Sequence, residues 1–323
     1  MTAVKQRIDF IDLVKGWVIF LVIWVHTDHP AWVTPNFVNS AFFLLSGLFF
    51  KKYEFGIFST KQVNSLLIPF IFFYLIAYPF RVVLHYWDFR TLETFDWGCI
   101  FDIFDSVDRP DYLFVNVPLW FILCIFFVKY YYWLICNAPK IILLFIAILA
   151  FILCRQINSI DTPFMMNNAV YWLGFFILGN LLFKWLTSKN KKGKISTIGI
   201  TGLLGLILYI AESQIESSFL LNIVTHVERL SLIIFTILIF SFLPTKYLAP
   251  LKFMGENTLA ILGYHFLILI PLFRLAHKIS GGEAHPYLIG LPCSIMTMII
   301  LYFVIKVSNK YIPALVGKGN LIK

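Results

Sequence analysis

Long apolar runs follow one another along the whole chain, separated by short charged segments. A helix needs about 20 mostly apolar residues to cross a bilayer, and shorter helices are tolerated inside a bundle. We therefore predict about ten transmembrane helices, at 10–29, 36–50, 63–85, 117–136, 140–155, 168–187, 195–212, 228–244, 257–275 and 287–309. The segment 211–227 fits no helix clearly. The predicted fold is all-α, a polytopic membrane bundle.

The composition gives no sign of a separate soluble domain. Hydrophobic residues make up 60% of the 323 positions and charged residues only 13%, whereas soluble domains carry about a quarter charged residues. No linker rich in Pro, Gly or Ser divides the chain, so we predict a single membrane domain over 1–323. The five cysteines show no CxxC spacing, and we expect neither a metal site nor a disulfide framework.

Charged residues between the apolar runs predict the orientation. Lysines gather in alternate loops, and such loops lie on the cytoplasmic side. These loops fall at 51–61, 140, 184–194, 246–252 and 306–323. The long segment 86–116 is instead rich in aspartate and is expected outside. Ten helices with both termini cytoplasmic satisfy this pattern. We attribute the net charge of +9 to the lysines of these cytoplasmic loops. We therefore expect the protein to contact membrane lipid and not nucleic acid.

The first apolar run carries two ionisable residues, Lys15 and His26. Eleven residues apart at 100° each, they share one helix face and lie about 16 Å apart along the axis. Ionisable residues inside a spanning helix usually face the bundle interior and mark a functional path. Two plainer interpretations remain open. Lys15 could snorkel to the interface or pair with Asp12, and His26 could pack under the outer headgroups.

A cation at one end of a helix face and an imidazole at the other suit an enzyme that draws a coenzyme into the membrane. The cation would hold phosphate, and the imidazole would act as a general base near ambient pH. The sequence contains no GxSxG, HExxH or Walker motif, so a hydrolase triad or an NTPase would lack its usual local signature.

Several motifs, taken in order, resemble the acyltransferase-3 superfamily, particularly its fucose 4-O-acetylase and exopolysaccharide O-acetyltransferase branch. Lys15 followed by His26 is similar to the family's Arg/Lys-x10-His motif. The further matching segments are Phe42-Phe43-Leu-Leu-Ser46-Gly47, Pro118-Leu-Trp120-Phe121, Gly174-Phe-Phe-Ile-Leu-Gly179 and Gly255-Glu256-Asn257, which leads to Tyr264-His265. The resemblance spans most of the chain.

Two segments depart from this family pattern. The family's Arg-x-x-Arg pair before the third helix is replaced by Lys61-Gln-Val-Asn64, so one contact with the coenzyme phosphates must come from elsewhere. Lys51 and Lys52 are candidates for it. Where the branch usually has His-Met-Pro, this chain has Val38-Asn39-Ser40, which affects the acceptor side of the predicted site.

The resemblance implies acetyl-CoA as donor and a carbohydrate hydroxyl as acceptor. It implies that His26 removes the hydroxyl proton, and that Lys15, Lys61 and Lys52 hold the coenzyme phosphates. Asp28 could orient His26 or be a solvated loop acid. The predicted pocket residues are Ser46, Trp120 and His265, although Trp120 could be an interface anchor and His265 could have only a structural partner in the bundle.

Two other classes of function remain open at this point. In a transporter or flippase of a polar glycan or lipid-linked precursor, the same Lys and His would couple protons or bind headgroups. A sensory or scaffolding membrane protein is a third possibility, but the lack of a soluble domain that could carry a signal argues against it. Family likeness and the charge pattern imply a bacterial inner membrane. The acceptor sugar, the acyl length and the oligomeric state are not predicted.

Overall fold

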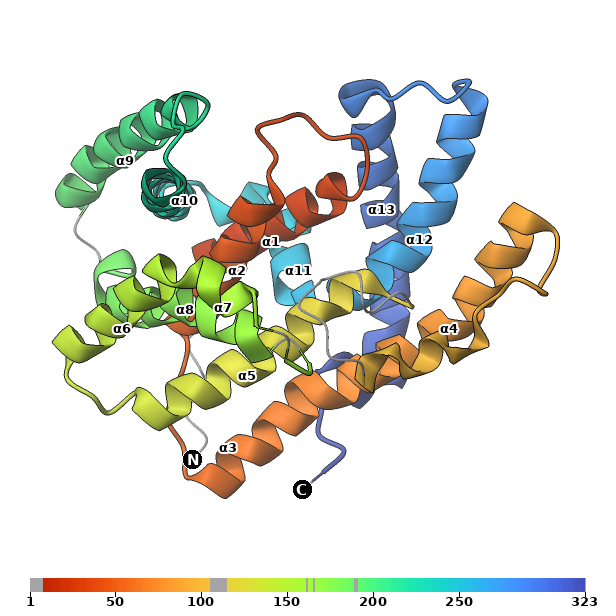
Figure 1. Ribbon diagram of the computed structural model, residues 1–323, viewed down its shortest axis with the longest axis horizontal. Helices are drawn as coiled ribbons and strands as arrows, with labels where there is room; N and C mark the ends of the chain where they lie inside the picture. Colours follow the sequence, from red (N-terminus) through yellow and green to blue (C-terminus); the bar gives the residue numbers. More distant parts are fainter. Residues whose placement is uncertain (1–7, 105–114, 161, 165, 189–190, 323) are drawn as a thin grey trace.

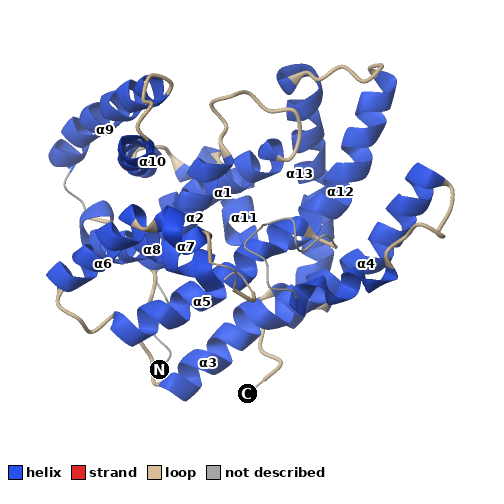
Figure 2. Cartoon of the chain, in the orientation of Figure 1, coloured by secondary structure: helices blue, strands red, loops and turns tan. Residues whose placement is uncertain are grey.

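The computed structural model describes residues 8–104, 115–160, 162–164, 166–188 and 191–322. Every regular element in these ranges is helical (Figure 2). The α-helices are α1 (Asp9–Val25), α2 (Pro35–Leu48), α3 (Phe55–Gln62), α4 (Ile68–Phe89), α5 (Trp120–Ile135), α6 (Lys140–Ile152), α7 (Cys154–Asn158), α8 (Met166–Leu186), α9 (Lys191–Glu212), α10 (Ser218–Phe240), α11 (Ala249–Glu256), α12 (Thr258–Ile279) and α13 (Leu291–Tyr311). The predicted all-α class is confirmed.

Short helical turns join or extend these helices. Two are π-helical, η1 (Val63–Leu67) and η6 (Pro286–Gly290). The others are 3-10 helices, η2 (Trp97–Phe104), η4 (Val117–Leu119), η5 (Thr245–Tyr247) and η7 (Pro313–Val316). Because η1 joins α3 to α4 without a break, residues 55–89 form one helix of 35 residues, which rises from α3 at the bottom of Figure 1 to α4 at its right-hand side.

Seven helices in the described part of the chain are long and apolar enough to cross a membrane. They lie at 55–89, 117–135, 166–186, 193–212, 218–240, 258–279 and 286–311. The segments 37–48 and 140–152 are apolar but shorter. Each of the ten predicted spans overlaps a helix, while the count of ten crossings and the two cytoplasmic termini stay predictions. Residues 105–114 of the acidic segment, and Lys189 in the lysine-rich one, lie outside the described residues.

The helix predicted at 228–244 begins ten residues earlier, at Ser218. Ser217 starts it, because its side chain accepts a hydrogen bond from the Leu220 N–H. The segment before residue 228, which fitted no predicted helix clearly, carries polar residues that bond neighbouring helices. Asn222 donates a hydrogen bond to the carbonyl of Phe151 on α6 at 2.8 Å. Nε2 of His226 lies 3.1 Å from the hydroxyl of Tyr171 on α8, which also accepts a hydrogen bond from Arg229 at 3.0 Å. Hydropathy scores such side chains as polar and cannot show that a neighbouring helix supplies their hydrogen-bond partners.

Helix α1 lies at the centre of the bundle, in contact with α2, α10, α11, α12 and α13. Nearly all its apolar side chains from Ile11 to Trp24 are buried. Around it, α9 pairs with α10 and α12 pairs with α13 on opposite sides of the molecule (Figure 1). Any chemistry carried by α1 therefore takes place inside protein rather than in lipid.

Glycines allow α1 to lie directly against α11. A Cβ at Gly16 would overlap the carbonyl of Leu251, and a Cβ at Gly255 would overlap the carbonyl of Asp12. The two helices therefore meet backbone to backbone, with a glycine on each side. Close approach of this kind is what small residues provide between membrane helices.

The same reciprocal arrangement joins α2 to α8. A Cβ at Gly47 would overlap the carbonyl of Phe176, and one at Gly179 would overlap the carbonyl of Leu44. Gly16 follows Lys15, and Gly47 follows Ser46. Lys15 and Ser46 thus each lie one residue before the glycine at which their helix packs against its neighbour.

Candidate active site

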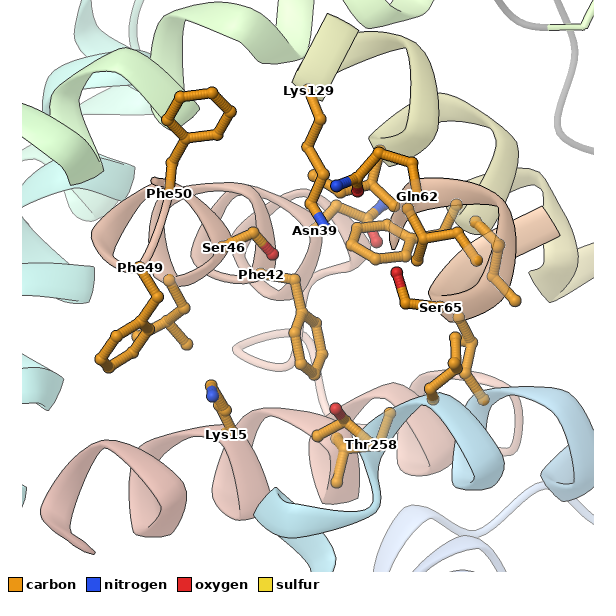
Figure 3. A pocket seen from close by; sticks show the side chains of 18 of the residues that line it. Lys15, Asn39, Phe42, Ser46, Phe49, Phe50, Gln62, Ser65, Lys129 and Thr258 are labelled. Carbon is orange, nitrogen blue, oxygen red and sulfur yellow. The ribbon is translucent and has the colours of Figure 1, made fainter. Parts of the chain in front are cut away.

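A cavity of about 810 Å³ opens between α1, α2, α3, α5 and the start of α12. Five residues named from the sequence line it, namely Lys15, His26, Ser46, Lys51 and Trp120. The other polar side chains in its wall are Asn39, Tyr53, Gln62, Ser65, Lys129 and Thr258, and aromatic rings such as Phe42 and Phe49 lie among them (Figure 3). Binding sites for small molecules commonly combine a mostly apolar wall with a few placed polar groups.

Lys15 projects from α1 into this cavity (Figure 3). Its ammonium lies 5.0 Å from the centre of the Phe49 ring and 3.6 Å from a carboxylate oxygen of Asp12. The pairing with Asp12 that the sequence allowed is therefore present, and the same side chain also lines the cavity. An ammonium group on the cavity wall can bind an anion as a point charge.

His26 caps the carboxyl end of α1, where its N–H still bonds the helix. Its ring lines the cavity. The ring centre lies 5.4 Å from that of His265 and 5.4 Å from that of Phe266. Lys15 and His26 thus occupy one cavity, as their spacing on a single helix face led us to expect.

His265 is fully buried behind His26 and does not line the cavity. Its Nδ1 lies 3.0 Å from each of the carbonyl oxygens of Ile261 and Leu262. Carbonyls only accept hydrogen bonds, so Nδ1 carries the proton and Nε2 has a free lone pair in the neutral ring. Within the described residues, Nε2 has no hydrogen-bond partner.

Asp28 binds the connecting loop end of the α12–α13 hairpin and does not face the cavity. Its Oδ2 lies 2.9 Å from Nε2 of His277 and accepts a hydrogen bond from the backbone N–H of His285 at 3.0 Å. Asp28 is absent from the cavity lining. These contacts fasten the chain after α1 to the hairpin, and they give the carboxylate a structural role.

Lys61 and Lys52 lie at the surface beside the cavity. The Lys61 ammonium sits 3.3 Å from the centre of the Tyr53 ring, and the Lys52 ammonium 5.2 Å from that of Trp133. Both lysines are exposed. Tyr53 and Lys51 belong to the cavity wall, so the two predicted phosphate ligands flank its rim.

Sequence reasoning missed Lys129, Gln62 and Asn39 as site residues. Lys129 lies inside the predicted span 117–136, and an ionisable residue there carries the same signal that singled out Lys15. Gln62 is uncharged and precedes the predicted span, so nothing in the sequence marks it. Asn39 was visible only as a departure from the family pattern.

Gln62 and the π-turn η1 that follows it contact both the cavity and the carboxyl-terminal segment. Gln62, Ser65 and Leu66 line it, whereas Asn64 binds the carboxyl-terminal segment. The Asn64 Oδ1 accepts hydrogen bonds from the N–H groups of Leu321 and Ile322, at 2.7 and 2.9 Å. π-turns inserted in α-helices are frequent at functional sites.

The apolar helices make this chain a multi-pass integral membrane protein, and the cavity between them, lined by lysines and a histidine, is large enough to hold a small molecule. The model of the acyltransferase-3 family, described as an acyltransferase domain, matches residues 8–307, and the chain belongs to this family. Comparisons with curated proteins and with solved structures find no match. Family membership supports a membrane acyltransferase over the transporter and scaffold alternatives.

Proposed function

We propose that the protein is an O-acetyltransferase that moves an acetyl group, or a related short acyl group, from acetyl-CoA to a hydroxyl of a surface carbohydrate or glycan precursor. The observation that carries this proposal is the shared cavity of Lys15 and His26. A cation and a titratable imidazole are the groups that a phosphate-bearing donor and a hydroxyl acceptor require.

The cavity residues fit a coenzyme A thioester. Three lysines line the cavity, Lys15, Lys51 and Lys129, and ammonium groups bind phosphate as point charges. The mixed apolar and amide wall between them suits an arm that carries both methyl and amide groups. In this proposal Lys61 and Lys52 attract the donor at the rim.

The proposed reaction transfers the acyl group directly. The neutral ring of His26 takes the proton of the acceptor hydroxyl while that oxygen attacks the thioester carbonyl carbon. The new C–O bond forms and the C–S bond breaks, and the leaving thiolate takes the proton from the His26 imidazolium to become the free thiol. His26 ends the cycle neutral, and no covalent acyl-enzyme is needed.

The orientation of the site follows from the predicted topology. With the amino terminus cytoplasmic, Lys15 lies toward the cytoplasm, where acetyl-CoA is made available, and His26 lies toward the outer leaflet. A glycan acceptor would approach His26 from that side. Family membership and the charge pattern together support a bacterial cytoplasmic membrane as the protein's location.

The test measures alkali-labile acyl esters on surface glycans by mass spectrometry in cells with the wild-type gene, no gene or His26→Ala. A matched control is His85→Ala, since His85 lies on α4 outside the cavity lining. Esters are expected in the wild type and the control only, with all variants inserted in the membrane. Equal ester content in all strains would refute the assignment and direct the next assay to glycan export.

A further inference from the structure

Three polar side chains from three different helices meet on the cavity wall opposite α1. Asn39 comes from α2, Gln62 from the end of α3 and Lys129 from α5. In Figure 3 they point toward one another across the upper part of the cavity, while Lys15 approaches from the opposite wall. We call these three residues, two carboxamides and one ammonium, the amide cluster.

The amide cluster contains a polar group without a partner. Gln62 is 8% exposed, and its Oε1 makes no hydrogen bond within the described residues. Leaving a buried carbonyl oxygen unpaired costs about 1–3 kcal/mol, so such groups usually await a ligand or water. Gln62 lines the cavity, and a ligand there can supply the missing N–H or O–H donor.

The cluster lies between the predicted entrance of the donor and the reacting end. Lys15 is six residues from the start of α1, and Lys129 is six residues from the end of α5. In the predicted topology both positions lie about 9 Å inside the cytoplasmic ends of their helices. His26 stands about 16 Å beyond Lys15. Phe49, at the end of α2, lies beside Lys15, and Asn39 lies ten residues back toward the start of α2, which follows the loop after His26. A donor that reaches from Lys15 to His26 therefore runs along the wall that carries Asn39 and Gln62.

We propose that Gln62 and Asn39 bind the amide groups of the pantetheine arm of the thioester donor, and that Lys129 binds one of its phosphates. This inference rests on the proposed function. The pantetheine arm carries secondary amides, each with one N–H donor and one carbonyl acceptor, and a carboxamide side chain offers the complementary pair. Lys129 has donors only, and it therefore suits the anionic part of the donor.

The test compares two probes, coenzyme A and free pantetheine, whose binding to the purified full-length protein is measured by calorimetry in one detergent. Pantetheine lacks the phosphates, so it isolates the contribution of the amides. The variants are Gln62→Leu and Lys129→Met. Gln214→Leu and Lys306→Met serve as matched controls, because both residues are exposed and lie outside the cavity lining.

Gln62→Leu is expected to weaken both probes by the same factor, about tenfold for one or two lost hydrogen bonds. Lys129→Met is expected to weaken coenzyme A about tenfold and to leave pantetheine within about twofold of the wild type. Both controls should bind like the wild type. Leu is close to Gln in size, and thermal unfolding of each variant verifies that it is folded.

Unchanged binding of both probes by folded Gln62→Leu overturns the inference. So does a Gln62→Leu variant that loses coenzyme A but keeps pantetheine. Because binding is measured without an acceptor or turnover, the outcome is independent of the ester assay. Absence of ester product in cells would count against the proposed function, whereas the two affinities decide the role of the amide cluster.

Discussion

The glycine crossing between α1 and α11 makes a quantitative prediction about Gly16→Ala. The added methyl would overlap the main-chain carbonyl of Leu251. A side chain could rotate away from such a methyl, but a helical carbonyl moves only with its helix. The variant must therefore separate α1 from α11 or tilt one against the other, and α1 is the helix that positions Lys15.

The magnitude follows from comparison with Gly199→Ala. Gly199 lies on the exposed face of α9, and a methyl added there would meet no atom within 4 Å. Both variants gain about 0.5–1 kcal/mol from the better helix propensity of alanine, and only Gly16→Ala has the overlap, for which overpacking costs about 1–3 kcal/mol. We expect Gly16→Ala to be less stable than Gly199→Ala by about 1–3 kcal/mol.

The assay is unfolding of both purified variants in the same detergent, followed by tryptophan fluorescence during titration with a denaturing detergent. The affinity for coenzyme A provides a second measurement, since displacement of α1 should also weaken it in Gly16→Ala. Equal unfolding free energies for the two variants would refute the argument that α1 is fixed by backbone contact. Equal stability with lost affinity would show that Gly16 matters only through Lys15.

Three further predictions follow from contacts described above. Asp28→Asn should lower the unfolding free energy by about 1–2 kcal/mol, because it weakens the bond to His277, and should leave the donor KM unchanged; a large KM change in steady-state assays would contradict this. Lys15→Ala should raise the donor KM at least about fivefold more than Lys61→Ala, since only Lys15 lines the cavity, and equal effects would place the phosphates at the rim. Tyr171→Phe should cost about 1–3 kcal/mol in the same detergent titration, because the lost hydroxyl accepts a hydrogen bond from Arg229 and donates one to Nε2 of His226. A neutral result would show that water replaces the hydroxyl.

The sequence was most informative where one periodic pattern reported on one helix. The spacing of Lys15 and His26 depends only on helix geometry, and the structure places both in one cavity. Apolar runs likewise located a helix at each predicted span, because burial in lipid requires the same composition from every crossing helix. Each of these inferences depends on one segment of the chain and not on its contacts with another helix.

Inference from the sequence failed where a residue's meaning depends on another helix. The start of α10 was missed because Asn222 and His226 find hydrogen-bond partners at Phe151 and Tyr171, far away in the chain. Gln62 and Lys129 become site residues only when α3 and α5 meet around the cavity. The contacts of Asp28 with the α12–α13 hairpin could not be read from its position two residues after His26.

The π-turn η1 has a practical consequence for handling this protein. One side of it lines the cavity through Ser65 and Leu66, while Asn64 on the same turn grips the backbone of Leu321 and Ile322. A purification handle fused downstream of Ile322 would therefore be attached next to residues that are hydrogen-bonded to the turn lining the cavity. A fluorophore attached at that point would leave the cavity itself unlabelled, and its emission would test whether donor loading moves η1.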